Sequence, residues 1–138
     1  MNLKRITGAG VALFAAVGLG VAAAPQASAL DGDCYLYSAC LYYNSSGYGY
    51  GAYFEQTGDI TNYGTTYRFQ PSTHGSGGAG VYVKNHAAYA DNWNPDSAFT
   101  VYEFSANGGS GRVDWIARYG EADLTVTHDN NAGAKFTG

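Results

Sequence analysis

From residue 30 to the end of the chain, apolar residues alternate with polar ones over short stretches, and no stretch has the 3.6-residue period of a helix. Gly, Asn, Asp and Ser separate these stretches, which is typical of turns between strands. The 13 tyrosines all lie in this part of the chain, and aromatic residues favour strands. The pattern therefore predicts an all-β protein.

Seven short segments carry the alternation and are predicted to be strands. They are residues 40–43, 51–54, 66–69, 81–84, 98–104, 112–117 and 124–128. Strands this short and this numerous are typical of an antiparallel sandwich. Two polar stretches between them, 71–80 and 91–96, are expected to form a flexible Gly/Ser loop and a turn.

The start of the chain has the layout of an export signal. A short basic start precedes an apolar stretch at 9–24 and small residues at 27–29. We therefore expect residues 1–29 to be a signal peptide that is removed. Residues 30–138 are expected to form a single secreted, extracellular domain.

The charge of this domain limits its partners. Removal of the signal leaves five basic and eleven acidic residues, which gives a net charge of −6. Nucleic acids and anionic membranes bind basic patches, so neither is an expected partner. The domain is expected to be a monomer.

Cys34 and Cys40 are the only cysteines in the sequence. Exported thiols usually oxidise, so this even pair predicts one disulfide that closes a short loop. The chain-entropy effect of such a bridge is about 2 kcal/mol. Because the spacing is not C-x-x-C, we interpret the bridge as structural and not as a redox site.

The domain contains a degenerate internal repeat, with halves at about 34–90 and 98–138. Residues 42–51 open the first half and residues 102–111 open the second. Each segment runs from a Tyr through small residues to a Gly nine positions later. An aromatic ring can cover a tight hairpin whose Gly adopts a positive φ. The two units are expected to bury their apolar faces against each other.

This arrangement resembles the βγ-crystallin Greek key, in which an aromatic residue precedes a folded hairpin with a required Gly. The domain is also similar to a family of small secreted bacterial peptidase inhibitors whose type member is a streptomycete metalloproteinase inhibitor. The segments that carry this second resemblance are Cys34 with Cys40, 41–46, 51–52, 83–88, and 101–102 with Gly111. The resemblance implies a sandwich of two Greek-key motifs. It also implies a non-enzymatic protein that inhibits a secreted peptidase, in particular a metallopeptidase.

One departure from the inhibitor family bears on function. The type inhibitor has a second disulfide that supports its protease-binding loop, whereas this chain has no cysteine after Cys40. That loop is therefore not carried over, and the loop at 71–80 is expected to be too flexible to replace it. Two other functions stay open. One is an extracellular βγ-crystallin-type structural or stress protein with weak or lost calcium binding, and the other is a killer-toxin-like antimicrobial protein.

Crystallin-type motifs bind calcium through the pattern N/D-N/D-x-x-S/T-S, and this makes Asn85, His86, Asn130 and Asn131 calcium candidates. The chain has Tyr and Ala where the pattern has Ser or Thr, so each turn lacks one side-chain oxygen. Calcium binding is therefore expected to be weak or absent, and no other cofactor is expected. The Asn residues are then expected to form turn hydrogen bonds.

The sequence offers no clear catalytic cluster. His74, His86 and His128 form no close metal-binding pair, and no serine lies in a G-x-S-x-G pattern. We therefore predict a binding protein and not an enzyme. Tyr48 and Tyr50 lie among glycines in the first hairpin, and they are candidates for a small exposed contact surface for protein or glycan. The alternative, which we favour slightly, is that they pack in the core or cover the turn.

Overall fold

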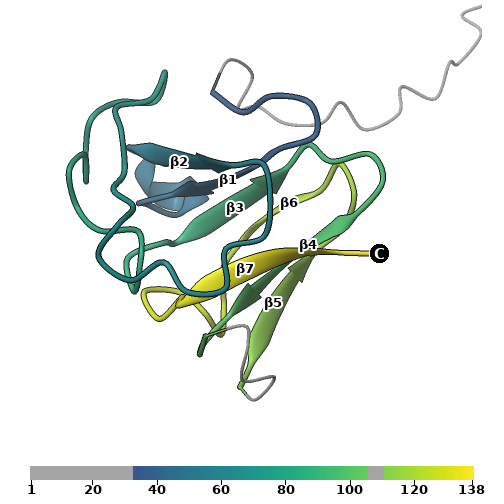
Figure 1. Ribbon diagram of the computed structural model, residues 1–138. Coiled ribbons are helices and arrows are strands. Elements are labelled where there is room, and N and C mark those ends of the chain that lie inside the picture. The colour runs from purple at the N-terminus through teal and green to yellow at the C-terminus, as the bar shows by residue number, and fades with distance from the viewer. Residues whose placement is uncertain (1–32, 106–110) are drawn as a thin grey trace, which may run out of the picture.

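The structure, a computed structural model, describes residues 33–105 and 111–138; the predicted signal segment at 1–29 lies outside them. In chain order the elements are β1 (Ala39–Tyr42), the 3-10 turn η1 (Ser46–Tyr48), β2 (Tyr53–Gln56), β3 (Tyr89–Asn92), β4 (Ala98–Tyr102), β5 (Val113–Ile116), β6 (Glu121–Asp123) and β7 (Gly133–Thr137) (Figure 1). Within these residues, no helix is long and apolar enough to cross a membrane. The predicted all-β class is confirmed.

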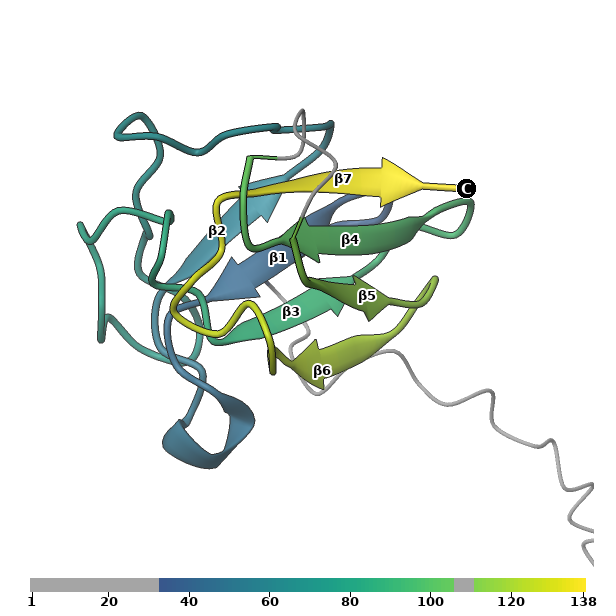
Figure 2. The ribbon, with the colours of Figure 1, turned by 90° about the horizontal axis from the view of Figure 1, so that it is seen from below.

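Two antiparallel sheets make up the fold (Figure 2). The first has the strand order β2-β1-β3-β6, and the second has the order β5-β4-β7. β1 and β4 hold the same place in the two halves, since each lies between two strands of its own half. Leu41 on β1 lies opposite Phe54, and Val101 on β4 lies opposite Asp114.

The two halves exchange a segment, which interlocks the two Greek keys. β6 belongs to the second half of the chain but pairs with β3 in the first sheet. Reciprocally, residues 60–63 of the first half pair with β7. Ile60 and Ala134 each donate a backbone N–H to the other's carbonyl, at 3.0 and 2.8 Å, and the Tyr63 N–H donates to Ala132 at 2.8 Å. Neither half therefore completes its sheet alone.

The loops that precede β3 and β7 also match each other. The Asn85 N–H donates to the Asn131 carbonyl at 2.8 Å, and the Asp129 N–H donates to the Ala87 carbonyl at 2.9 Å. Asn85 and Asp129 both have positive φ, +64° and +53°, a conformation that Asn and Asp tolerate better than most residues. The backbones of the halves thus correspond residue by residue at this point.

One apolar core lies between the sheets and receives side chains from both halves. Its largest members are Leu41, Tyr63, Phe69, Val83, Phe99, Val101, Ile116 and Leu124. Full burial of a side chain of this kind contributes roughly 1.5–3 kcal/mol. A second cluster holds Cys40 and Tyr42, which alternate with Leu41 and therefore point to the other face of β1.

Gly51 and Gly111 occupy equivalent turns, as the repeat predicts. Both have positive φ, +69° and +131°. A Cβ atom would lie 2.8 Å from the Asn44 amide nitrogen at Gly51, and 2.8 Å from the Phe104 ring at Gly111. The covering side chain comes seven residues earlier in both halves. The covering residue in the second half is aromatic, but it is Phe104 and not Tyr102, which opens the repeat. In the first half the amide of Asn44 and the carbonyl of Gly77 lie closest to the added Cβ.

Three predicted strands are wrong. Residues 66–69 and 81–84 meet only through a single bridge between Arg68 and Tyr82. Residues 124–128 are irregular, because backbone N–H groups there donate to the Asp114 carboxylate and not to a neighbouring strand.

Conversely, the alternation does not predict β3, β6 or β7. Every residue of β6 is exposed, so its sequence shows no alternation of apolar and polar residues that would predict a strand. β3 begins before the stretch 91–96 that was interpreted as a turn, and its polar residues Asp91 and Asn92 are buried. The Asn92 amide donates to the carbonyls of Ser97 and Ala117, both at 3.0 Å, which satisfies this buried group.

Candidate functional site

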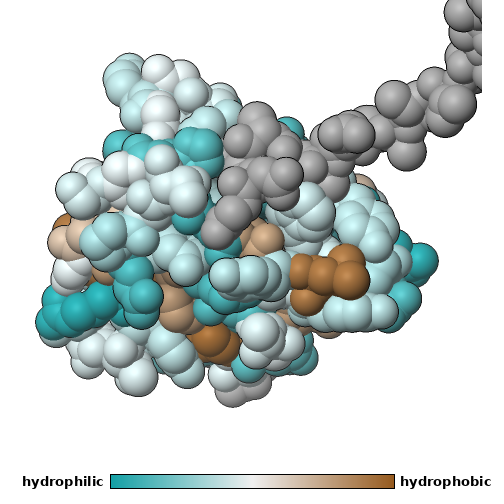
Figure 3. Space-filling view, turned by 90° about the horizontal axis from the view of Figure 1, so that it is seen from above, coloured by the Kyte–Doolittle hydropathy of each residue, from teal (hydrophilic) through white to brown (hydrophobic). Residues whose placement is uncertain are grey.

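A disulfide-closed turn before β1 exposes three consecutive apolar side chains. The predicted bond between Cys34 and Cys40 is present, with 5.8 Å between the Cα atoms. Tyr35, Leu36 and Tyr37, which we call the apolar turn, are 65%, 55% and 55% exposed. Seen from above, the molecule shows a mostly hydrophilic face with separate hydrophobic residues (Figure 3). Single exposed apolar residues are common on protein surfaces, whereas three in succession need an explanation.

The backbone of the apolar turn is closed by its own hydrogen bond. The Ser38 N–H donates to the Tyr35 carbonyl at 3.0 Å, and Tyr37 has a φ of +69°. A positive φ at the third position is typical of a type II turn, which usually places Gly there. Tyr37 holds this less favourable conformation because the surrounding contacts fix it.

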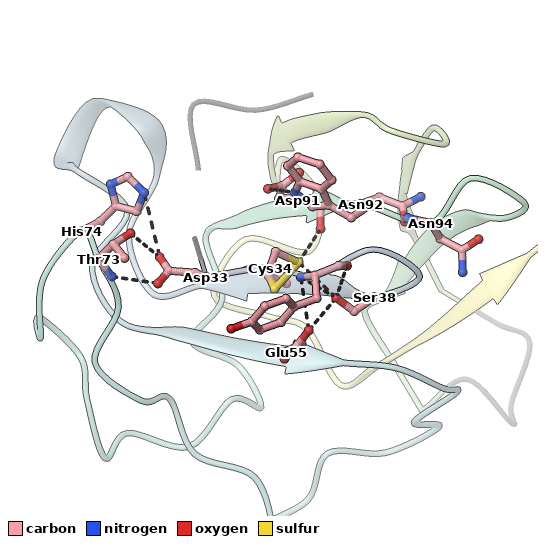
Figure 4. Close-up of a disulfide and its surroundings, with 12 residues drawn as sticks. Asp33, Cys34, Ser38, Glu55, Thr73, His74, Asp91, Asn92 and Asn94 are labelled. Carbon is pink, nitrogen blue, oxygen red and sulfur yellow. Dashed lines mark hydrogen bonds and ion pairs between the residues drawn. A yellow bond between two sulfur atoms is a disulfide. The ribbon is translucent and has the colours of Figure 1, made fainter. Parts of the chain in front are cut away.

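Glu55 on β2 binds both ends of the turn. The Ser38 hydroxyl lies 2.7 Å from Oε1 of Glu55 and 2.6 Å from the Tyr35 carbonyl oxygen (Figure 4). The Tyr35 N–H donates to the same carboxylate at 3.3 Å. One side chain of the first sheet therefore anchors the turn.

The segment after β3 anchors the opposite side of the turn. The Tyr37 N–H donates to the Trp93 carbonyl at 3.2 Å, and the Trp93 N–H donates to the Ser38 carbonyl at 2.9 Å. The indole N–H of Trp93 donates to Oδ2 of Asp91 at 2.8 Å. With the disulfide, these contacts hold the apolar turn on three sides.

Asp33 ties the segment before the disulfide to the loop at 71–80. Its carboxylate accepts hydrogen bonds from the Thr73 N–H at 2.8 Å and the Thr73 hydroxyl at 2.9 Å (Figure 4). Nε2 of His74 lies 4.0 Å from the same carboxylate. The His74 ring packs edge-on against Tyr50, with 5.1 Å between ring centroids.

The loop at 71–80 is also bound to the first hairpin, contrary to its predicted flexibility. The Ser72 hydroxyl donates to the Gly51 carbonyl at 2.6 Å, and the Gly77 carbonyl accepts the Ala52 N–H at 2.8 Å. The high Gly and Ser content misled the prediction, because small residues also allow close approach to a neighbouring chain.

The tyrosines beneath this loop are structural. Burial raises the pKa of Tyr42, and the nearby carboxylates of Asp33 and Asp91 raise it further. Burial and a hydrogen bond with Glu121 raise the pKa of Tyr89 in the same way. Neither phenol ionises near neutral pH, so this cluster supplies no phenolate for chemistry.

A pocket of about 220 Å³ opens where the first hairpin meets the second half of the chain. The first half contributes Tyr43, Asn44, Ser45, Tyr48 and Ala88, and the second half contributes His128 and Asp129. We call it the inter-half pocket. Nδ1 of His128 lies 3.6 Å from Oδ2 of Asp129.

Of the two tyrosines that are candidates for a contact surface, only Tyr48 is fully exposed, at 82%. Tyr50 is half-buried, and its ring centroid lies 4.9 Å from that of Tyr89. Tyr50 also has a positive φ of +64°, and its ring packs against the rings of Tyr42 and His74 as well. Tyr48 is therefore the more exposed of the two, and Tyr50 is partly engaged in the aromatic cluster.

The four calcium candidates lie in the matched loops before β3 and β7. The Asn131 side chain is buried, and it accepts the Ala87 N–H at 3.0 Å and donates to the Val83 carbonyl at 2.9 Å. Asn130 donates to Oε1 of Glu103 at 2.8 Å. His86 is exposed, with Nδ1 2.8 Å from the Lys84 carbonyl oxygen, and Asn85 contributes its left-handed backbone to the turn. Asn131 thus forms the turn hydrogen bonds that the sequence suggests.

Across residues 33–105 and 111–138, no group of three or more His, Cys, Asp or Glu side chains is placed to hold a metal ion. Calcium can also use carbonyl and amide oxygens. The Asn131 amide oxygen is buried and already accepts the Ala87 N–H, so it is a poorly available ligand for a cation.

The sequence interpretation missed most of the apolar turn and of the inter-half pocket. The signal for the turn was present, since the two cysteines enclose the sequence Y-L-Y-S-A, which has no charge. The pocket had no such signal, because Asn44 and Asp129 are far apart in the sequence and only the interlocked sheets bring them together.

Comparisons with known proteins bear on the fold alone. No family model matches the sequence, and no curated protein matches it. A solved structure described as "Evolution of the eye lens beta-gamma-crystallin domain fold" superposes with a TM-score of 0.55 at 10% identity, over 77% of this chain and 90% of that chain. At this identity the likeness shows the fold alone, which is a βγ-crystallin-like sandwich of two Greek keys.

Proposed function

We propose that this chain is a secreted, non-enzymatic binding protein that contacts an extracellular peptidase through the apolar turn. The observation that supports the proposal most is the pairing of three exposed apolar side chains with a fixed backbone. A loop that is already ordered loses little conformational entropy when it binds. Tyrosine adds contact area at a low entropy cost as well.

The shape of the turn favours one way of binding. A type II turn is compact, so it offers side chains to a partner and not an extended peptide bond that a peptidase can cleave. Leu36 occupies the second position of the turn and Tyr37 the third. We therefore expect Leu36 to enter an apolar pocket of the peptidase, with the two tyrosines packed around the rim.

The resemblance to secreted peptidase inhibitors suggested this class of partner, and the structure supplies a rigid element in a different place. The second disulfide loop of the type inhibitor has no counterpart here, whereas the first disulfide closes the apolar turn. The excess of acidic residues would favour a partner with a basic surface, by raising the association rate.

A titration against a panel of secreted zinc endopeptidases tests the proposal. The mature protein should bind or inhibit at least one of them, and Leu36→Ser should weaken that binding by about 2 kcal/mol if Leu36 is a central contact. Trp115→Ser is the matched control, because Trp115 is 63% exposed on β5, far from the turn in sequence. Equal affinity of the wild type and Leu36→Ser would refute the proposed contact.

A second candidate is an extracellular structural protein of the crystallin type, which the likeness to a βγ-crystallin domain supports at the level of the fold. In that case no peptidase binds, and the protein itself resists unfolding. A rise in Tm with added calcium would favour this candidate, since a ligand that binds only the folded state raises its stability.

A further inference from the structure

The inter-half pocket differs from the rest of the molecule in how its polar groups are used. The carboxylate of Asp123 accepts the N–H and the hydroxyl of Ser46 at 2.7 and 2.6 Å. Asp33, Glu103 and Asp114 are engaged in a similar way. Side-chain carboxylates and amides of this fold are thus commonly satisfied by neighbours in the same chain.

The pocket is different. Within the described residues, the side chains of Asn44, Ser45, Tyr48, His128 and Asp129 make no hydrogen bond, and the closest polar approach among them is 3.6 Å between His128 and Asp129. Five side chains with free hydrogen-bonding capacity therefore converge on one concave site. Two halves of the chain contribute to it, so the interlocked fold itself forms the site.

The charges at the pocket argue against an ion as the ligand. No Lys or Arg lines it, so an anion such as phosphate would meet the Asp129 carboxylate without a compensating cation. A calcium ion needs six to eight oxygen ligands, and the lining has one carboxylate, beside an imidazole. The remaining groups are a neutral amide and neutral hydroxyls, which suit a neutral ligand with many hydroxyl groups.

The exposed ring of Tyr48 and the volume of the pocket narrow the choice of ligand further. The Tyr48 ring is 82% exposed beside the opening and packs against no other ring of the described chain, so a face is free to cover a ligand. Pockets that bind drug-sized ligands measure roughly 300–1,000 Å³, whereas this pocket measures about 220 Å³. One ring of six or so atoms with its hydroxyl groups is the size that fits.

From these observations we infer that the inter-half pocket binds one neutral sugar residue, stacked on Tyr48 and hydrogen-bonded to Asn44, Asp129 and His128. The site is separate from the apolar turn, and its occupation does not depend on the proposed peptidase contact. A ligand of this size binds with a Kd of about 1 mM or weaker, because affinity scales with the number of ligand atoms.

The test is a titration of the isotope-labelled mature protein with glucose, galactose, mannose and N-acetylglucosamine, each alone, followed by NMR. At least one sugar should give saturable shifts of the Asn44 side-chain amide and of the backbone amides of residues 128 and 129. Tyr48→Ala should raise the Kd by about fivefold or more. Asp129→Asn, which keeps a residue suited to positive φ, should also raise it, whereas Tyr35→Ala, a matched change in the apolar turn, should leave it unchanged.

Three results would overturn the inference. They are the absence of saturable shifts with all four sugars up to tens of millimolar, an unchanged Kd in Tyr48→Ala, and larger pocket shifts with calcium chloride or sodium phosphate than with any sugar. The peptidase titration is read separately. Loss of sugar binding in Tyr48→Ala with normal peptidase binding, and the reverse in Leu36→Ser, would show that the two sites act independently.

Discussion

The two halves of this protein have similar backbones but differ in the side chains that pack against equivalent strands. In the first half Phe54 packs against Tyr63 and Tyr67, with ring centroids 5.9 and 5.2 Å apart. Asp114 holds the corresponding place in the second half, and its carboxylate accepts hydrogen bonds from the N–H and hydroxyl groups of Thr125 and Thr127 at 2.6–3.0 Å. An aromatic cluster therefore supports β2 in the first half, and a polar network supports the equivalent strand β5 in the second.

This difference shows which features specify the fold. Both halves keep a positive-φ glycine at the hairpin, a central strand between two partners, and a reciprocal pair of bonds between the loops before β3 and β7. The side chains that fill the space around these features are free to vary. The first half carries the exposed apolar turn and Tyr48, whereas in the second half the polar network around Asp114 mainly stabilises the fold.

The largest effect is expected at the hairpin glycines. Gly51→Ala and Gly111→Ala should each lower the free energy of unfolding by about 2–4 kcal/mol, because the new Cβ meets a close neighbour and the backbone has a positive φ. Gly58→Ala is the control, since nothing lies within 4 Å of its added Cβ. Urea unfolding measures all three. Loss of stability at only one of Gly51 and Gly111 would break the equivalence of the halves.

The next effect concerns the polar network of the second half. Asp114→Ala should cost about 1–3 kcal/mol, because it leaves the N–H and hydroxyl groups of Thr127 without their partner in a buried position. Asp96→Ala is the control, since Asp96 is exposed and its side chain makes no hydrogen bond with the described residues. A loss of the same size in both variants would show that the network contributes nothing specific.

The same network predicts a dependence on pH. Burial alone would raise the pKa of Asp114, but the hydrogen bonds from Thr127 and Thr125 together outweigh it and lower the pKa. The stabilisation by this carboxylate is thus complete above its unfolded-state pKa of about 3.9, and it is lost as the pH falls through the lower folded value. Between about pH 5 and pH 2, the Tm of the wild type should fall more steeply than that of Asp114→Asn. Parallel curves would contradict this assignment.

The smallest effect on stability is expected at the apolar turn. Tyr35→Ser and Leu36→Ser change exposed side chains, so each should alter the free energy of unfolding by no more than about 0.5 kcal/mol. Glu55→Gln, which weakens the anchor of the turn, should cost more than either. If Leu36→Ser proved strongly destabilising, Leu36 would be part of the core and unavailable to a partner.

The sequence predicted the features that depend on local pattern. The all-β class, the disulfide, and the paired glycines at 51 and 111 follow from alternation, cysteine count and turn chemistry, and the structure confirms them. The exchanged strands could not be found in this way. β6 is polar at Glu121 and Asp123, and it is a strand only because β3 lies beside it.

In the apolar turn and the inter-half pocket, too, the sequence predicted local features and missed those that depend on the tertiary fold. The cysteine pair predicted the disulfide that closes the apolar turn but not the exposed turn itself. The anchors Glu55 and Trp93 come from distant segments, and their role depends on the tertiary fold. Tyr48 was found because glycines on both sides suggested exposure. The same argument did not predict the packing of Tyr50, whose half-buried ring contacts Tyr42, His74 and Tyr89 from distant parts of the chain. His128 and Asp129 reach the pocket only through the interlocked sheets.

The central claim is that the halves fold as one unit because each completes the other's sheet, and the two tryptophans allow a direct test. Trp93 lies between the halves but packs against the cluster that holds Cys40 and Tyr42 of the first, and Trp115 lies on β5 of the second. In Trp115→Phe and Trp93→Phe, urea unfolding followed by the remaining tryptophan should have the same midpoint as unfolding of the same variant followed by circular dichroism. If the fluorescence and circular dichroism midpoints separate in either variant, so that one half loses its structure before the other, the interlocked account is wrong.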